Sequence, residues 1–139
     1  MIYGIGHDLV EIARISQMRE RSTWPRFLER ILTEEERQLA EQRSGRVVEF
    51  VAGRFAAKEA VVKALGCGIG DKVGFMDIEI LPDHQGKPHC TLSEQAWRRL
   101  MDAPTDHHSE HQTYHIHVSI THQPTLASAF AIFERRVDG

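Results

Sequence analysis

The sequence predicts an α+β fold, a single domain over residues 1–139 in which a mostly antiparallel sheet packs against one long central helix. Residues 47–65 are rich in helix-forming residues, which predicts the long helix. Residues 113–121 alternate in strand fashion, and a turn separates them from a last strand at 126–134. Strands and helices are interspersed without a regular βαβ rhythm, so we expect antiparallel pairing.

The first 42 residues carry the signals of one strand and three helices. An apolar run opens the chain, and its β-forming residues predict a strand that runs into a helix. Thr33 and Glu36 stand at the spacing of a capping box, which marks the start of a polar helix. The expected elements are a strand beginning in 2–12 and helices near 9–20, 26–32 and 34–42.

The remaining residues predict a hairpin, a short helix and the two final strands. The long helix ends at Gly66, and Gly68 and Gly70 follow it in a flexible loop. Ser93 can cap the short helix. The expected elements are strands at 76–81 and 87–92 around a turn at 83–86, a helix at 94–101, a polar loop at 104–112 and the strands named above.

The composition is that of an ordinary globular protein, with 41% hydrophobic and 27% charged residues. No apolar run approaches the roughly 20 residues of a membrane helix, and the N-terminus lacks the features of a signal peptide. Cys67 and Cys90 show no metal-binding spacing, which indicates reduced thiols in the cytoplasm. A net charge of −3 argues against a general nucleic-acid binder. We therefore expect a cytoplasmic protein that binds neither membrane nor nucleic acid.

The segment 54–66 carries an unusual group of charges. Glu59 and Lys63 stand one turn apart on one helix face, and Arg54 and Lys58 stand one turn apart on a second stripe. One carboxylate among three cations suits a phosphate that is bridged by a hard cation such as Mg²⁺. Such pairs are also common on solvated faces, where each adds little stability, so the helix alone leaves both interpretations open.

Asp8 supplies a second carboxylate at the end of the first strand. Gly4 and Gly6 precede it, and glycines let the backbone turn tightly or approach a ligand closely. Asp8 alone would be a turn or N-cap residue. Asp8 and Glu59 together, from distant parts of the chain, form the protein share of a typical Mg²⁺ shell, with water and phosphate oxygens as the other ligands.

Three segments resemble the motifs of a known family. Residues 4–15 resemble the opening motif of the holo-[acyl-carrier-protein] synthases, the short bacterial 4′-phosphopantetheinyl transferases. Residues 55–66 resemble their second motif, and residues 117–122 are similar to their third. The motifs come in the family order, and the resemblance covers nearly the whole chain.

The resemblance implies transfer of 4′-phosphopantetheine from coenzyme A to a serine of apo acyl carrier protein, in fatty acid biosynthesis. Adenosine 3′,5′-bisphosphate would be released. Asp8 and Glu59 would be the Mg²⁺ ligands, and Lys63 would offset charge on the pyrophosphate, so these three are the expected catalytic residues. The base that takes the serine proton is left open between Glu59 and a water held by the metal or by Asp8.

The resemblance also implies a binding site for coenzyme A. Arg54 and Lys58 would hold phosphate groups, with the 3′-phosphate as one candidate. The glycine loop would admit close backbone approach to the nucleotide. The expected coenzyme A-binding residues are Arg54, Lys58, Lys63, Gly66, Gly68, Ser119, Thr121 and His122.

Residues 13–30 hold five arginines against two glutamates, a basic segment in an acidic chain. Such a patch suits an acidic partner, although a solvated helix face has the same composition. In this family the first helix docks the acidic carrier protein. The expected docking residues form a basic rim around an apolar centre: Arg14, Met18, Arg21, Arg26 and Phe27.

The family resemblance also implies a homotrimer with active sites between subunits, and it leaves open which subunit supplies Asp8 and which Glu59. Two rival functions remain: a non-catalytic module that grips an acidic protein, and another coenzyme A enzyme, such as an acyltransferase, that needs no metal.

Histidines are concentrated in residues 107–117. His115 and His117 would share one face of a strand, so a transition-metal site is one interpretation. We favour a solvated polar insertion, because clustered histidines in a polar loop usually lack a fixed ligand geometry.

Overall fold

The computed structural model describes residues 1–101 and 112–137. It has the α+β architecture that the sequence predicts, with one long helix against an antiparallel sheet. In chain order the elements are β1 (Ile2–Glu11), α1 (Ile12–Arg19), α2 (Trp24–Ile31), α3 (Glu34–Glu41), α4 (Val47–Leu65), the 3₁₀ helix η1 (Phe75–Asp77), β2 (Ile78–Pro82), β3 (Pro88–Leu92), α5 (Glu94–Met101), β4 (Gln112–His122) and β5 (Leu126–Val137).

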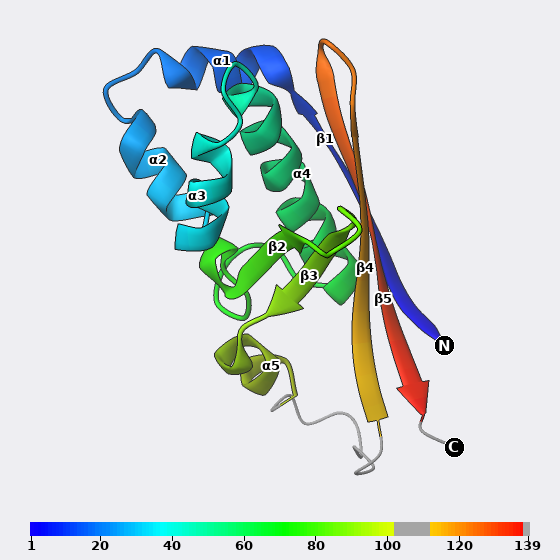
Figure 1. Ribbon diagram of the computed structural model, residues 1–139. Helices are drawn as coiled ribbons and strands as arrows, with labels where there is room; N and C mark the ends of the chain where they lie inside the picture. The colour runs from blue at the N-terminus through cyan, green and yellow to red at the C-terminus, as the bar shows by residue number, and fades with distance from the viewer. Residues whose placement is uncertain (102–111, 138–139) are drawn as a thin grey trace.

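The main sheet has the strand order β1-β5-β4, and both pairings are antiparallel. Helix α4 lies between this sheet and the smaller helices α1, α2 and α3 (Figure 1). The β2–β3 hairpin forms a separate two-stranded sheet. Helix α4 is therefore the centre of the fold, and most of its residues are buried, whereas Glu59 and Lys63 are not.

Strand β1 packs directly on the backbone of α4. A Cβ atom on Gly4 would collide with the carbonyl oxygen of Ala64, and one on Gly6 with that of Ala60. Only glycine permits this approach, so the two glycines serve contact with a helix. The sequence interpretation, a tight turn or approach to a ligand, is wrong on this point. The close packing brings Asp8, two residues after Gly6, to the surface of α4.

Several boundaries differ from the sequence prediction. Strand β1 continues to Glu11, where a helix was expected from residue 9, because its ladder with β5 extends as far as the pair Glu11 and Leu126. Asp8 thus lies within the strand, opposite Ala129, and not at its end. The predicted bounds of α4 and α5 are confirmed.

The capping box at the start of α3 is confirmed. The Thr33 hydroxyl accepts from the backbone N–H of Glu36, and Oε1 of Glu36 accepts from the N–H of Thr33. Within residues 1–101 and 112–137, no helix is both long enough and apolar enough to cross a membrane.

Candidate active site

Asp8 and Glu59 meet at one pocket, which we call the acidic pocket. Asp8 reaches it from β1 and Glu59 from α4, and Phe55 and Arg14 also line it. The two carboxylates of one chain thus line the same pocket. The close packing of β1 on α4 explains how residues 51 positions apart come together.

The charged groups of the acidic pocket have opposing effects on the pKa of Glu59. Partial burial raises the pKa of Glu59, the nearby charge of Asp8 raises it further, and Lys63 offsets part of the shift. Nζ of Lys63 lies 3.1 Å from Oδ1 of Asp8 and also donates to the carbonyl oxygen of His7. Lys63 is 52% exposed, so its ammonium can turn towards a ligand. Two like charges side by side favour a cation between them.

The donor set fits a hard cation. Among the described residues, no group of three or more His, Cys, Asp or Glu side chains is placed to hold a metal ion. Two carboxylates are fewer ligands than a dedicated protein cage supplies. They match the needs of Mg²⁺, which keeps several waters and takes its other ligands from substrate phosphates.

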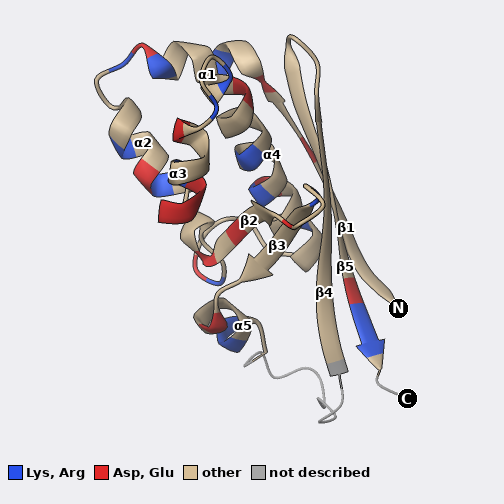
Figure 2. Cartoon of the chain, viewed as in Figure 1, with Lys and Arg blue, Asp and Glu red and all other residues tan. Residues whose placement is uncertain are grey.

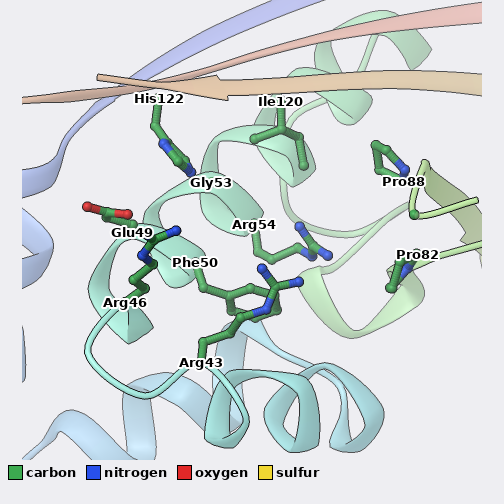
Figure 3. A pocket seen from close by; sticks show the side chains of 11 residues that line it. Arg43, Arg46, Glu49, Phe50, Gly53, Arg54, Pro82, Pro88, Ile120 and His122 are labelled. Atoms are coloured by element: carbon green, nitrogen blue, oxygen red, sulfur yellow. The ribbon is translucent and has the colours of Figure 1, made fainter. Parts of the chain in front are cut away.

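A second pocket, the arginine pocket, opens beside the N-terminal half of α4. Figure 3 shows Arg43 and Arg54 against the ring of Phe50, with Arg46, His122 and the carboxylate of Glu49 to one side of it. The guanidinium carbons of Arg54 and Arg43 lie 4.5 Å and 5.4 Å from the centre of that ring. Three guanidinium groups and an imidazole form a site for a phosphate group.

Arg54 is held rigidly in the arginine pocket. Its Nε donates to the carbonyl oxygen of Ile80 at 3.0 Å, and its side chain is largely buried. Burial lowers the pKa of Arg54, and the negative charge of Glu36 raises it in part. The guanidinium stays charged at neutral pH, and Nε is its only atom with a hydrogen bond among the described residues.

Arg43 and Arg46 were not among the sequence-predicted binding residues. Both are exposed and lie in the segment before α4. Two arginines three residues apart, just before the helix that carries Arg54, were the available signal. His122 lies 76 positions after Arg46 in the sequence, and only the fold places it in the same pocket.

Lys58 does not fit its predicted phosphate role. Its side chain is 0% exposed, and Nζ donates to Oε1 of Glu36 at 2.6 Å and to the carbonyl oxygens of Ile31 at 2.7 Å and Phe75 at 3.0 Å. An ammonium has three N–H donors, so none remains for a phosphate. The helical stripe that Lys58 shares with Arg54 faces the interior, which its spacing could not reveal.

The third motif is divided between two faces of the sheet. His122 lines the arginine pocket, together with Ile120. Side chains alternate along a strand, so Ser119 and Thr121 point to the opposite face, away from α4. They therefore do not line the arginine pocket of this chain, and their place in a coenzyme A cleft stays a prediction. Gly66 caps α4 with a φ of 79°, and Gly68 has open space beside it; their contact with a nucleotide stays a prediction.

The expected docking residues lie on α1, on α2 and, for Arg21, in the connection between them. Arg14, Arg21 and Arg26 are exposed, whereas Met18 and Phe27 are half-buried and pack against the core. Figure 2 shows the cationic segments of these helices on the side of the molecule away from the main sheet. Arg14 also lines the acidic pocket, so the basic surface continues to the carboxylates.

The histidine run gives no support for a metal site. The rings of His115 and His117 lie 6.3 Å apart on β4, and His117 pairs with Glu134 at 3.1 Å. His107, His108 and His111 lie outside the described residues.

Comparison with known proteins identifies the family. Residues 4–128 match the model of the 4′-phosphopantetheinyl transferase superfamily. A holo-[acyl-carrier-protein] synthase of Anoxybacillus flavithermus is 46% identical over 136 residues, which are 97% of this chain and 98% of that protein. The Bacillus anthracis synthase, solved with CoA (3′,5′-ADP), is 44% identical with a TM-score of 0.75, and the match covers 96% of this chain and 97% of that one. The Helicobacter pylori synthase, solved with coenzyme A, is 32% identical with a TM-score of 0.76, over 94% and 99% of the two chains. The chain therefore belongs to the 4′-phosphopantetheinyl transferase superfamily and, within it, to the holo-[acyl-carrier-protein] synthases.

Proposed function

We propose that this chain transfers 4′-phosphopantetheine from coenzyme A to a serine of acyl carrier protein, with Mg²⁺ held by Asp8 and Glu59. The observation that carries the proposal is the pair of pockets on α4, one acidic and one rich in arginine. Arg54 and Glu59 are five residues apart, which is about 7.5 Å along a helix. Five residues also turn about 140° around the helix axis, so a ligand that contacts both pockets must be as extended as coenzyme A.

The arginine pocket suits the nucleotide end of coenzyme A. Arg43, Arg46 and Arg54 can hold its 3′-phosphate, and His122 adds a further donor. The Bacillus anthracis and Helicobacter pylori relatives were solved with coenzyme A or its nucleotide product, which supports the same ligand here. The product that leaves this pocket would be adenosine 3′,5′-bisphosphate.

The acidic pocket suits the reacting phosphate. Mg²⁺ bound there would act as a Lewis acid that neutralises charge on the pyrophosphate. Lys63, within reach of Asp8, donates to the leaving phosphate oxygen as negative charge develops on it. The nucleophile is the carrier serine, so the enzyme needs to position it in line rather than supply its own nucleophile. Glu59, whose pKa is raised by burial and by Asp8, is our candidate to accept the serine proton.

The basic surface of α1 and α2 suits the carrier protein. Acyl carrier proteins are acidic, and exposed arginines speed and orient the docking of an acidic partner. Arg14 joins this surface to the acidic pocket, so a carrier docked there would present its serine next to Glu59. We place this reaction in the cytoplasm and assign it to fatty acid biosynthesis.

The uncovered face of the main sheet suits assembly into a homotrimer. Ile5, Leu9 and Phe130 are 62%, 56% and 49% exposed, and they lie on the face opposite α4. Apolar patches of this kind mark contact surfaces. Ser119 and Thr121 share this face, so in a trimer they would be available to the active site of a neighbouring subunit. Light scattering of the wild type and of Phe130→Glu tests this, because the charge should give a smaller species.

The test of the proposed reaction is the mass of the carrier. Apo carrier protein incubated with the chain, coenzyme A and Mg²⁺ should gain about 340 Da, the phosphopantetheine group. EDTA should abolish the gain. A binding module would give no gain, and an acyltransferase would modify nothing without an acyl group. A gain that survives EDTA would overturn the metal roles of Asp8 and Glu59.

A further inference from the structure

The buried pair of Lys58 and Glu36 joins five elements of the fold. The acceptors of the Lys58 ammonium are the last residue of α2, the first residue of η1 and a side chain of α3. Oε1 of Glu36 also accepts from the N–H of Thr33 at 2.8 Å, and Oε2 accepts from the N–H of Ile80 in β2 at 3.0 Å. Both side chains are 0% exposed. The bonds to Ile31 and Ile80 and the bond between Lys58 and Glu36 are buried, whereas those to Phe75 and Thr33 are part-buried.

Such a pair is poorly explained by stability alone. Removing two charges from water is costly, and apolar residues of equal volume are often as stable as a buried ion pair. The hydrogen bonds of Lys58 and Glu36, however, can all form only when the five elements keep their present relative positions. A displacement of α2 against α4 would leave a buried charge without its partners, which costs several kcal/mol. The pair therefore selects one position of α2 on α4.

Both of these helices belong to the proposed site. Ile31, which accepts from Lys58, ends the helix that carries Phe27 of the docking surface. Lys58 directly precedes Glu59. The ring centres of Phe27 and Phe55 lie 6.4 Å apart, and Phe55 also lines the acidic pocket. The position of α2 on α4 thus sets where a docked protein lies relative to Glu59.

We propose that Lys58 and Glu36 are positioning residues that hold the docking helix α2 against the catalytic helix α4. Neither residue contacts substrate. The pair places the serine of a docked carrier at the acidic pocket, and its loss misplaces that serine without emptying the coenzyme A site. This inference rests on the proposed function.

The test is the double variant E36Q/K58M, which removes both charges and keeps one amide oxygen as an acceptor for the N–H group of Thr33 or of Ile80. Turnover should be measured well below the melting transition, with near-ultraviolet circular dichroism as evidence of native packing. We expect kcat for carrier modification to fall at least about tenfold, because a misplacement of about 1 Å can cost that much. The Kd of coenzyme A, measured by calorimetry, should stay within about threefold of the wild-type value, since a positioning role leaves that site intact.

The matched control is E94Q/R98M on α5. It removes an ion pair of the same 2.6 Å length whose side chains are 77% and 69% exposed. It should leave kcat unchanged. If E36Q/K58M fails to fold, the single variant E36Q takes its place, since it retains Lys58 and its two carbonyl acceptors. We expect E36Q to lower kcat at least about threefold, again with unchanged coenzyme A affinity.

Two results would overturn the positioning role: a folded variant with wild-type kcat, or a loss of kcat matched by an equal loss of coenzyme A affinity. The second would show that the pair supports α4 as a whole. A wild-type chain that modifies no carrier would instead refute the proposed function, so the two failures are distinguishable.

Discussion

The two pockets of α4 differ in charge, in rigidity and in what they can do. The arginine pocket holds one cation that is fixed before any ligand arrives, since Arg54 is bonded to Ile80 and lies over Phe50. The acidic pocket holds two carboxylates that repel each other, with a half-exposed Lys63 beside them. The first arrangement suits binding of a stable anion. In the second, Lys63 offsets part of the repulsion and a bound cation would relieve more of it, which suits chemistry.

The largest effect should follow from loss of an acidic-pocket carboxylate. Glu59→Gln or Asp8→Asn should lower kcat by about 10²–10³-fold, because the charge that would hold Mg²⁺ is gone. Steady-state assays of carrier modification measure it. The control is Glu35→Gln, an exposed residue of α3, which should keep wild-type activity.

Loss of an arginine-pocket cation should affect binding instead. Arg54→Met should raise the KM for coenzyme A by about 10–100-fold, the value of one or two hydrogen bonds to a charged group. Its kcat at saturation should stay near that of the wild type. A fall in kcat with unchanged KM would place Arg54 in the chemistry and break the contrast between the pockets.

The packing of β1 on α4 should be sensitive to a single methyl group. Gly6→Ala forces the strand away from the carbonyl oxygen of Ala60 and should cost about 1–3 kcal/mol of unfolding free energy. Urea denaturation measures this. Gly68→Ala is the control: its Cβ would meet open space, so it should be nearly neutral.

The docking surface should contribute less than either pocket. Arg21→Ala should raise the KM for carrier protein by about 5–10-fold and leave that for coenzyme A unchanged. Arg14→Ala should raise the same KM, and its place in the acidic pocket lets it lower kcat as well. If either variant raised the KM for coenzyme A and left the KM for carrier protein unchanged, the docking assignment would be contradicted.

The smallest effect concerns stability without metal. The pKa of Glu59 is raised in the folded state. The contribution of Glu59 to the free energy of unfolding of the metal-free chain is therefore highest at low pH, and it falls as the pH rises through the pKa of Glu59. Metal-free Glu59→Gln should therefore melt about 1–3 °C above the metal-free wild type at pH 7. The difference should vanish as the pH falls towards the ordinary glutamate pKa. An equal or lower melting temperature at pH 7 would mean that the two carboxylates do not strain the fold.

Local patterns predicted the helices of this fold well. The bounds of α4 and α5 and the capping box of α3 follow from residues close in sequence. The extension of β1 to Glu11 does not, because it depends on the pairing with β5. The approach of Gly6 to Ala60 was hidden for the same reason.

The candidate site was predicted in part. Asp8 and Glu59 were named from their chemistry and the family motifs, and the fold brings them together. Lys58 was misjudged, because helical spacing shows which residues share a stripe but not which stripe faces inward. Arg43 and Arg46 were missed, because the pocket that they share with His122 is formed by tertiary packing.

The most direct test of the division between the pockets is the preference for coenzyme A over dephospho-coenzyme A, which lacks the 3′-phosphate. It is the ratio of the two kcat/KM values, measured for the wild type, Arg54→Met and Glu59→Gln. The ratio should fall towards one in Arg54→Met and stay at the wild-type value in Glu59→Gln, despite its low activity. A ratio that is unchanged in Arg54→Met, or lost in Glu59→Gln, would contradict the division of binding and chemistry along α4.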